Sequence, residues 1–213
     1  MNQEHRKTTP EVERRYAADG MEIRQTDGGK ATLRGYAARF GSVYSMGWYT
    51  EEVHRDAFRN ADMSDVRILF NHDPNQILGR TKAGTARVGV DSEGLWYEVD
   101  LPESATGIRE SVARGDIDQS SWGFMLRVSK ESSGDKWERR DGKDHRTLTD
   151  VSTVFDASPV TFPANPDTSV AKRSFDAYSE QQAPEVDDTN EFELLDLDLS
   201  LMEMEIELHK TNT

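Results

Sequence analysis

Cysteine is absent from the 213 residues of this chain, which excludes disulfides and thiol nucleophiles. No run of eighteen or more apolar residues occurs, so we expect no membrane-spanning helix. The polar segment 1–15 has no apolar core of the kind found in a secretory signal, and we expect an intracellular, soluble protein. Zinc-ligand spacings and glycine-rich phosphate loops are also lacking, so we expect neither a metal nor a cofactor.

Basic residues are outnumbered, and the excess of acid is concentrated at one end of the chain. The net charge is −14, of which residues 174–213 carry −11 and residues 1–173 carry −3. The nearly balanced body shows no basic stripe with interleaved aromatic residues, so direct binding of nucleic acid is not expected. An acidic segment of this kind can instead meet a basic partner.

Composition divides the chain into three parts. Residues 1–20 are expected to be a disordered arm, 21–173 a folded domain and 174–213 an acidic tail. Apolar residues of the tail recur at steps of two as well as three and four, so the pattern fits both a strand and a helix. We favour a helix, because the length of this stretch suits a helix better. Its apolar surface suits docking to a partner, although a tail that only solubilises or dimerises the protein fits equally well.

Short stretches with alternating polar and apolar residues dominate the folded domain. Alternation and turn signals predict strands at 21–24, 31–40, 66–70, 83–90, 95–101, 121–128 and 148–160. Short helices are predicted at 51–60 and 104–114, and the charged stretch 131–145 is expected to be a loop or a hairpin tip. This pattern favours a mainly β fold with peripheral helices (α+β), either a barrel or a sandwich.

His72 is a candidate general base. It follows the apolar run 66–70, and Pro74 and Asn75 are expected to form a turn directly after it, which would place the ring at a sheet edge. A neutral imidazole can accept a proton near pH 7 if it reaches a hydroxyl. The alternative is a surface histidine with no role in chemistry.

Ser121 is the candidate nucleophile, at the start of a predicted strand. Alternation puts Ser121 and Gly123 on one face and Ser120, Trp122 and Phe124 on the other. The large rings belong in the core, so Ser121 is preferred over Ser120. Gly123 would allow a close backbone approach, as at an oxyanion site or a tight strand crossing.

Asp156 is the candidate acid that would orient the histidine. It lies between the apolar Phe155 and Ala157, and a buried acid needs a partner. Asp150 and His145 are rivals for this role. A base, a nucleophile and an orienting acid together are the parts of a serine hydrolase.

In their order and spacing, these motifs resemble those of the prohead (capsid maturation) serine proteases of tailed bacteriophages. The resemblance extends from about residue 33 to about residue 170, and its most specific part is Ser-Pro-Val-Thr-Phe-Pro-Ala-Asn-Pro at 158–166. Further matching segments lie at 33–37, 70–73, 77–80, 94–95, 115–117 and 121–124.

The resemblance implies a fold and a set of site residues. The fold would be like that of herpesvirus assemblin, a β-barrel surrounded by helices. His72 would be the general base and Ser121 the nucleophile of a serine endopeptidase. Asp156 falls where the family usually has glutamate, and because herpesvirus relatives use a second histidine there, His145 could serve instead.

The resemblance also implies a biological setting. Members of the family work inside the immature capsid, in the host cytoplasm, where they cut the scaffold or the scaffolding segment of the major capsid protein and also themselves. We therefore expect capsid or scaffold partners, self-association, and self-cleavage that could remove the tail near residues 172–174. The competing hypothesis is a catalytically inactive assembly factor on a protease fold, against which the presence of all three candidate residues argues.

Overall fold

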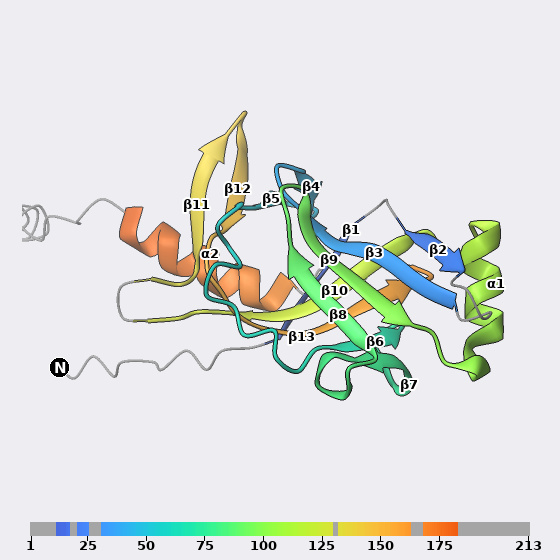
Figure 1. Cartoon of the computed structure of the whole chain (residues 1–213). Helices are drawn as coiled ribbons and strands as arrows, with labels where there is room; N and C mark the ends of the chain where they lie inside the picture. The colour runs from blue at the N-terminus through green and yellow to red at the C-terminus, as the bar shows by residue number, and fades with distance from the viewer. Residues whose placement is uncertain (1–11, 18–20, 26–30, 130–131, 163–167, 183–213) are drawn as a thin grey trace, which may run out of the picture. The chain divides into compact units, whose positions relative to one another are not determined.

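The structure is a computed structural model that describes residues 12–17, 21–25, 31–129, 132–162 and 168–182 (Figure 1). The chain divides into two compact units, Met1–Phe175 and Asp176–Thr213. The strands are β1 (Glu13–Ala17), β2 (Glu22–Gln25), β3 (Ala31–Arg39), β4 (Tyr44–Ser45), β5 (Tyr49–Val53), β6 (Arg67–Phe70), β7 (Asp73–Arg80), β8 (Ala86–Val90), β9 (Gly94–Asp100), β10 (Gln119–Leu126), β11 (Asp135–Arg140), β12 (Lys143–Leu148) and β13 (Val151–Val160). The helices are α1 (Thr106–Arg114), α2 (Thr168–Gln182) and the 3-10 turns η1 (Thr81–Ala83) and η2 (Glu103–Ala105).

The strands of the described ranges form three hydrogen-bonded sheets. The five-stranded sheet has the order β1-β10-β13-β6-β7, and two four-stranded sheets have the orders β11-β12-β5-β4 and β2-β3-β9-β8. In Figure 1, β10 and β13 run side by side, and α1 lies next to β2. The mainly β class is therefore confirmed. The expected barrel with surrounding helices is not, because each sheet is open and has two edge strands.

Several sequence predictions of local structure are confirmed, and others are wrong. The helix predicted at 104–114 is α1, which Gly115 ends with a left-handed φ of 80°. The charged stretch 131–145, predicted as a loop or a hairpin tip, contains the tip of the hairpin formed by β11 and β12. By contrast, 51–60 is not a helix, since its first residues belong to β5, where buried and half-buried residues alternate. Residues 13–17, placed in the disordered arm, form β1.

The charged residues of β1 are buried in an ion-pair network, which explains why this strand looks like a solvated arm in the sequence. Arg15 pairs with Glu51 of β5 and lies 2.6 Å from Glu13. Arg146 of β12 lies 2.6 Å from both Glu13 and Asp135. Burial alone would raise the pKa of Glu51, but the charges of Arg15 and Arg146 outweigh it and hold that pKa below its ordinary value.

This network joins β1 to the sheet that contains β5, β11 and β12. Because the folded-state pKa of Glu51 is depressed, its contribution to stability is present above the ordinary pKa of 4.5. That contribution is lost as the pH falls through the folded-state pKa. Since β1 also pairs with β10, the network fixes the strand next to Ser121.

We expect Arg146→Met to destabilise the fold by about 3–5 kcal/mol, because it leaves buried carboxylates without a counter-charge. Arg140→Met is the matched control: Arg140 is an exposed arginine of the same hairpin, paired with Glu138, and only a small loss is expected. Urea denaturation at neutral pH measures both. Equal losses in the two variants would contradict this account of the network.

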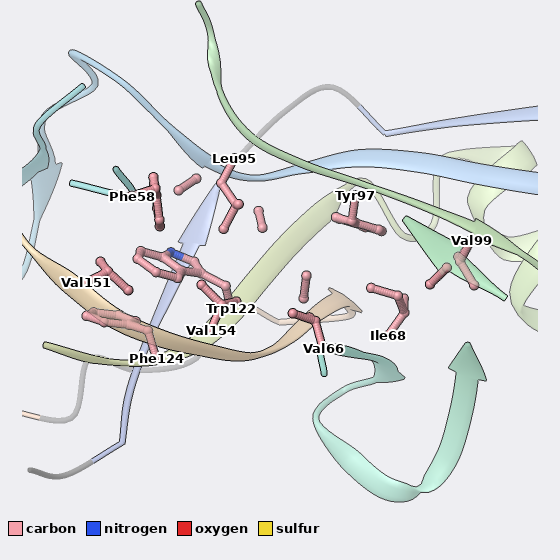
Figure 2. Close-up of a cluster of buried hydrophobic side chains, with 14 of the residues drawn as sticks. Phe58, Val66, Ile68, Leu95, Tyr97, Val99, Trp122, Phe124, Val151 and Val154 are labelled. Atoms are coloured by element: carbon pink, nitrogen blue, oxygen red, sulfur yellow. The ribbon is translucent and has the colours of Figure 1, made fainter. Parts of the chain in front are cut away.

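The hydrophobic core fixes which face of β10 points inward. Figure 2 shows Trp122 and Phe124 among the buried side chains of Phe58, Val151 and Val154. The centroid of the Trp122 ring lies 5.2 Å from the ring centroid of Phe58 and 4.0 Å from that of Phe124. Burying a side chain such as Phe124 stabilises the fold by about 1.5–3 kcal/mol. A one-residue slip of β10 would turn both rings out of this core and onto the face that carries Ser121, and it is therefore strongly disfavoured.

Candidate active site

Two adjacent strands in the five-stranded sheet bring the candidate nucleophile and acid together. In the antiparallel register of β10 and β13, Ser121 lies opposite Ser158 and Gly123 lies opposite Asp156. Directly opposed residues project from the same face of a sheet, so these four share the face turned away from Trp122. The next pair is Phe124 with Val154, so Phe155 has no partner on β10 and forms a β-bulge beside Asp156. Bulges of this kind are often found next to active sites.

His72 is in the tight turn between β6 and β7. Phe70 pairs with Asp73, and the two residues between them, Asn71 and His72, have φ angles of 54° and 57°. Positive φ at both central residues is the pattern of a type I′ hairpin turn. The turn predicted at Pro74 and Asn75 is therefore wrong by three residues. Pro74 belongs to β7, an edge strand, where a missing N–H is tolerated.

Asn71 ties this turn to the end of β13. Its backbone N–H donates to the carbonyl of Pro159 over 3.0 Å. Its side-chain Oδ1 accepts from the Thr161 N–H at 2.8 Å, and its Nδ2 donates to Thr161 Oγ1 at 3.1 Å. Asparagine also tolerates the left-handed conformation better than most residues. These contacts hold His72 over the face that carries Ser121 and Asp156.

The three candidate residues form a continuous hydrogen-bonded chain. His72 Nε2 lies 2.6 Å from Ser121 Oγ, and His72 Nδ1 lies 2.5 Å from Asp156 Oδ1. An ionised carboxylate only accepts hydrogen bonds, so a neutral imidazole donates its Nδ1–H to Asp156. The Nε2 lone pair then faces the Ser121 hydroxyl. This is the tautomer that a general base needs in order to take a proton from serine.

The rival residues have other partners. Ser120 Oγ lies 2.9 Å from the hydroxyl of Tyr97, on the core side of β10. His145 is buried on β12, where Nδ1 lies 2.8 Å from Thr50 Oγ1. Asp150 pairs with Arg127 at 3.3 Å. Within the part of the chain that the structure describes, no hydrogen bond or ion pair joins these three residues to His72, Ser121 or Asp156.

The candidate trio is poorly accessible to water. Ser121 has no exposed surface, and the side chains of His72 and Asp156 are 11% and 9% exposed. A low local dielectric strengthens the interactions within the chain of hydrogen bonds. It also means that a peptide can reach Ser121 Oγ only after the groups that cover it have moved.

Gly123 makes room for the acid. A Cβ atom at this position would lie 2.5 Å from Asp156 Oδ2, closer than real Cβ contacts allow. The sequence predicted a close approach of backbone at Gly123, whereas the group that approaches is the Asp156 carboxylate. Only the cross-strand register, which pairs Gly123 with Asp156, reveals this role.

We expect Gly123→Ala to lower the catalytic rate constant about 10- to 100-fold, because the new methyl group displaces the Asp156 carboxylate from His72. Gly107→Ala is the control, because a Cβ atom at position 107 would meet no atom within 4 Å and Gly107 lies on α1, away from the candidate site. Steady-state kinetics on the same substrate would compare the two variants. Full activity of Gly123→Ala would mean that the carboxylate does not need this space.

Ser158 belongs to the site, although it was not predicted as a site residue from the sequence. The sequence marks 158–166 as distinctive but gives Ser158 no chemical role. Its Oγ lies 2.7 Å from Asp156 Oδ1, and Ser158 is fully buried. The signal available in the sequence was its period-two spacing from Asp156, which places both side chains on one face of a strand.

The described ranges lack two other kinds of feature, a metal-binding cluster and a membrane-spanning helix. No group of three or more histidine or acidic side chains that could hold a metal ion occurs among the described residues. None of the helices found there is long and apolar enough to cross a membrane. Most of the acidic tail, from residue 183 on, lies outside the described residues.

Comparison with known proteins gives one family match. The model of a family described as caudovirus prohead serine protease matches residues 19–181, a range that includes His72, Ser121 and Asp156. A search of curated proteins finds no match. Among solved structures, the bacteriophage T4 capsid assembly protease is similar, with 9% identity and a TM-score of 0.41 over 70% of this chain and 98% of that chain.

Proposed function

The chain belongs to the caudovirus prohead serine protease family, and we propose that it is an active serine endopeptidase with Ser121 as its nucleophile. The observation that carries this proposal is the chain of hydrogen bonds from Ser121 Oγ through His72 to Asp156, with distances of 2.6 and 2.5 Å. A serine is a weak nucleophile unless a base adjoins it, and a base works best when a third group orients it.

The mechanism follows from these positions. His72 Nε2 takes the proton of Ser121 as Oγ attacks the carbonyl carbon of a peptide bond. The resulting imidazolium is stabilised by Asp156 and gives its proton to the leaving amine as the peptide C–N bond breaks, which leaves an acyl group on Ser121 Oγ. A water molecule, deprotonated by His72, then attacks this ester, and His72 returns the proton to Ser121 Oγ as the ester bond breaks and the acid product leaves. Backbone N–H groups would stabilise the oxyanion in both steps.

The proposed substrates are the scaffold protein or the scaffolding segment of the major capsid protein. Cleavage would take place inside the immature capsid, in the host cytoplasm, where the protein would also associate with itself. Co-expression with the capsid and scaffold genes of the same phage, followed by mapping of new N-termini, tests this. We expect discrete new termini with the wild type and none with His72→Ala. Intact capsid and scaffold proteins in both cultures would contradict the substrate assignment.

The chain itself is a further proposed substrate. The expected cut near residues 172–174 falls within α2, where Ser174 Oγ lies 2.7 Å from Asp135 Oδ2. Cleavage there requires the helix to open locally first. Intact-mass spectrometry should find purified wild type lighter than Ser121→Ala by the mass of a released segment. Identical masses would count against self-cleavage.

The competing proposal is an assembly factor that keeps the fold without activity. One observation favours it, namely that Ser121 has no exposed surface. However, an inactive protein has no need for a serine, a histidine and an acid in this geometry. Labelling of Ser121 by a fluorophosphonate separates the two proposals, since an inactive protein would not be labelled.

A further inference from the structure

Ser158 occupies a distinct position within the candidate site. It lies two residues after Asp156 on β13 and directly opposite Ser121 on β10. Its side chain has no exposed surface. Ser158 Oγ lies 2.7 Å from Asp156 Oδ1, the oxygen that is 2.5 Å from His72 Nδ1.

Two donors therefore converge on a single oxygen of the carboxylate. An ionised carboxylate cannot donate, so the hydroxyl of Ser158 donates to Asp156, as does the Nδ1–H of His72. Hydrogen bonds to a charged acceptor are about twice as strong as those between neutral groups. The other oxygen, Oδ2, lies over Gly123, which has no side chain that could hold it.

The rotation of a carboxylate about its last bond is soft, because this torsion has no sharp rotamer wells. The geometry points to Ser158 as a positioning residue: we propose that its hydroxyl fixes the Asp156 carboxylate so that Oδ1 faces His72. This inference rests on the proposed function. Ser158 would act only through Asp156 and would not touch the substrate.

A role for Ser158 as the nucleophile fits the geometry less well. The nitrogen that could take its proton, His72 Nε2, lies 2.6 Å from Ser121 Oγ, whereas the Ser158 hydroxyl is bonded to Asp156. If Ser158 were the nucleophile, its replacement would abolish the reaction. A positioning residue should instead produce a partial loss that depends on Asp156.

A double-mutant cycle tests this dependence. The readout is the rate at which a fluorophosphonate probe labels the full-length protein. We expect Ser158→Ala to lower this rate about tenfold, as for the loss of one hydrogen bond to a charged group. In an Asp156→Ala background, the same change should have no further effect. An equal fold-loss in both backgrounds, or no loss in either, would overturn the proposal.

Ser152→Ala is the matched control on the same strand. Ser152 Oγ donates to the carbonyl of Met125 over 3.1 Å, and none of its bonds reaches Asp156. We expect its labelling rate to equal that of the wild type. Thermal melting of each variant checks that it is folded.

A second readout does not depend on activity. The proton NMR resonance of His72 Nδ1–H should move in Ser158→Ala, disappear in Asp156→Ala and stay unchanged in Ser152→Ala. An unmoved resonance in Ser158→Ala would overturn the positioning role. If the resonance moves while the wild type takes no label, the positioning role stands and the proposed function fails.

Discussion

Replacing Ser121 with alanine is expected to lower peptide-bond cleavage by at least about 10⁴-fold while the protein stays folded. The hydroxyl is the attacking group of the proposed mechanism, and the only side chain to which it hydrogen-bonds among the described residues is His72. Alanine is smaller than serine by a single oxygen atom and fits the same buried space. Cleavage of purified scaffold or capsid protein, followed by mass spectrometry, measures the loss.

Ser120→Ala is the matched control for this prediction. Ser120 precedes Ser121 on the same strand, but its Oγ lies 2.9 Å from the buried hydroxyl of Tyr97 on the core side. We expect this variant to lose some stability, because Tyr97 is left without its partner, and to keep its activity. Cleavage at the normal sites by Ser121→Ala, or an inactive Ser120→Ala, would show that the wrong serine has been assigned.

Replacing Asp156 with alanine is expected to lower the catalytic rate constant about 10⁴-fold, as removal of the acid does in other serine proteases. Without the carboxylate, nothing holds the Nδ1–H of His72, and Nε2 no longer presents its lone pair to Ser121. The Michaelis constant should change little, because Asp156 contacts the Nδ1 side of the His72 ring, away from the Nε2 that faces Ser121. Steady-state kinetics with the wild type and the variant would separate the two constants.

His145→Ala is the decisive comparison, since a second histidine is the main rival for the third role. His145 contacts Thr50 Oγ1 at 2.8 Å and lies 3.5 Å from Glu52, in the sheet formed by β11, β12, β5 and β4. Its replacement should lower the stability of the fold and leave the catalytic rate constant near that of the wild type. A larger kinetic loss in His145→Ala than in Asp156→Ala would exclude our choice of the acid.

The sequence predicts His72, Ser121 and Asp156 as site residues, and the structure brings the three side chains together, while their catalytic roles stay predictions. The alternation of Ser121 with Trp122 and Phe124 fixes the face of β10, because the rings must be buried. The contribution of Gly123 could not be predicted in this way. It depends on which residue of β13 lies opposite Gly123 on β10, and a single sequence does not determine cross-strand register or the bulge at Phe155. Ser158 is different, because its contact with Asp156 lies within β13 and only the chemical role of their period-two spacing was missed.

The fold was predicted less completely for a similar reason. Burial of Glu13 and Arg15 depends on Glu51 and Arg146, which are far away in the sequence, so β1 appears from its own residues to be a solvated arm. The segment 51–60 was predicted as a helix, but its first three residues belong to β5, which pairs with β12, and the residues after Val53 form turns. Local propensity is a weak guide wherever such tertiary contacts dominate.

The central claim is that Ser121 is a nucleophile activated by His72, and site-resolved labelling tests it most directly. Full-length wild type and His72→Ala would be treated with a fluorophosphonate, digested and sequenced by tandem mass spectrometry. We predict a single adduct on Ser121 in the wild type and none in His72→Ala. An adduct on Ser120 or Ser158, equal labelling of the two proteins, or no adduct in the wild type would contradict the claim.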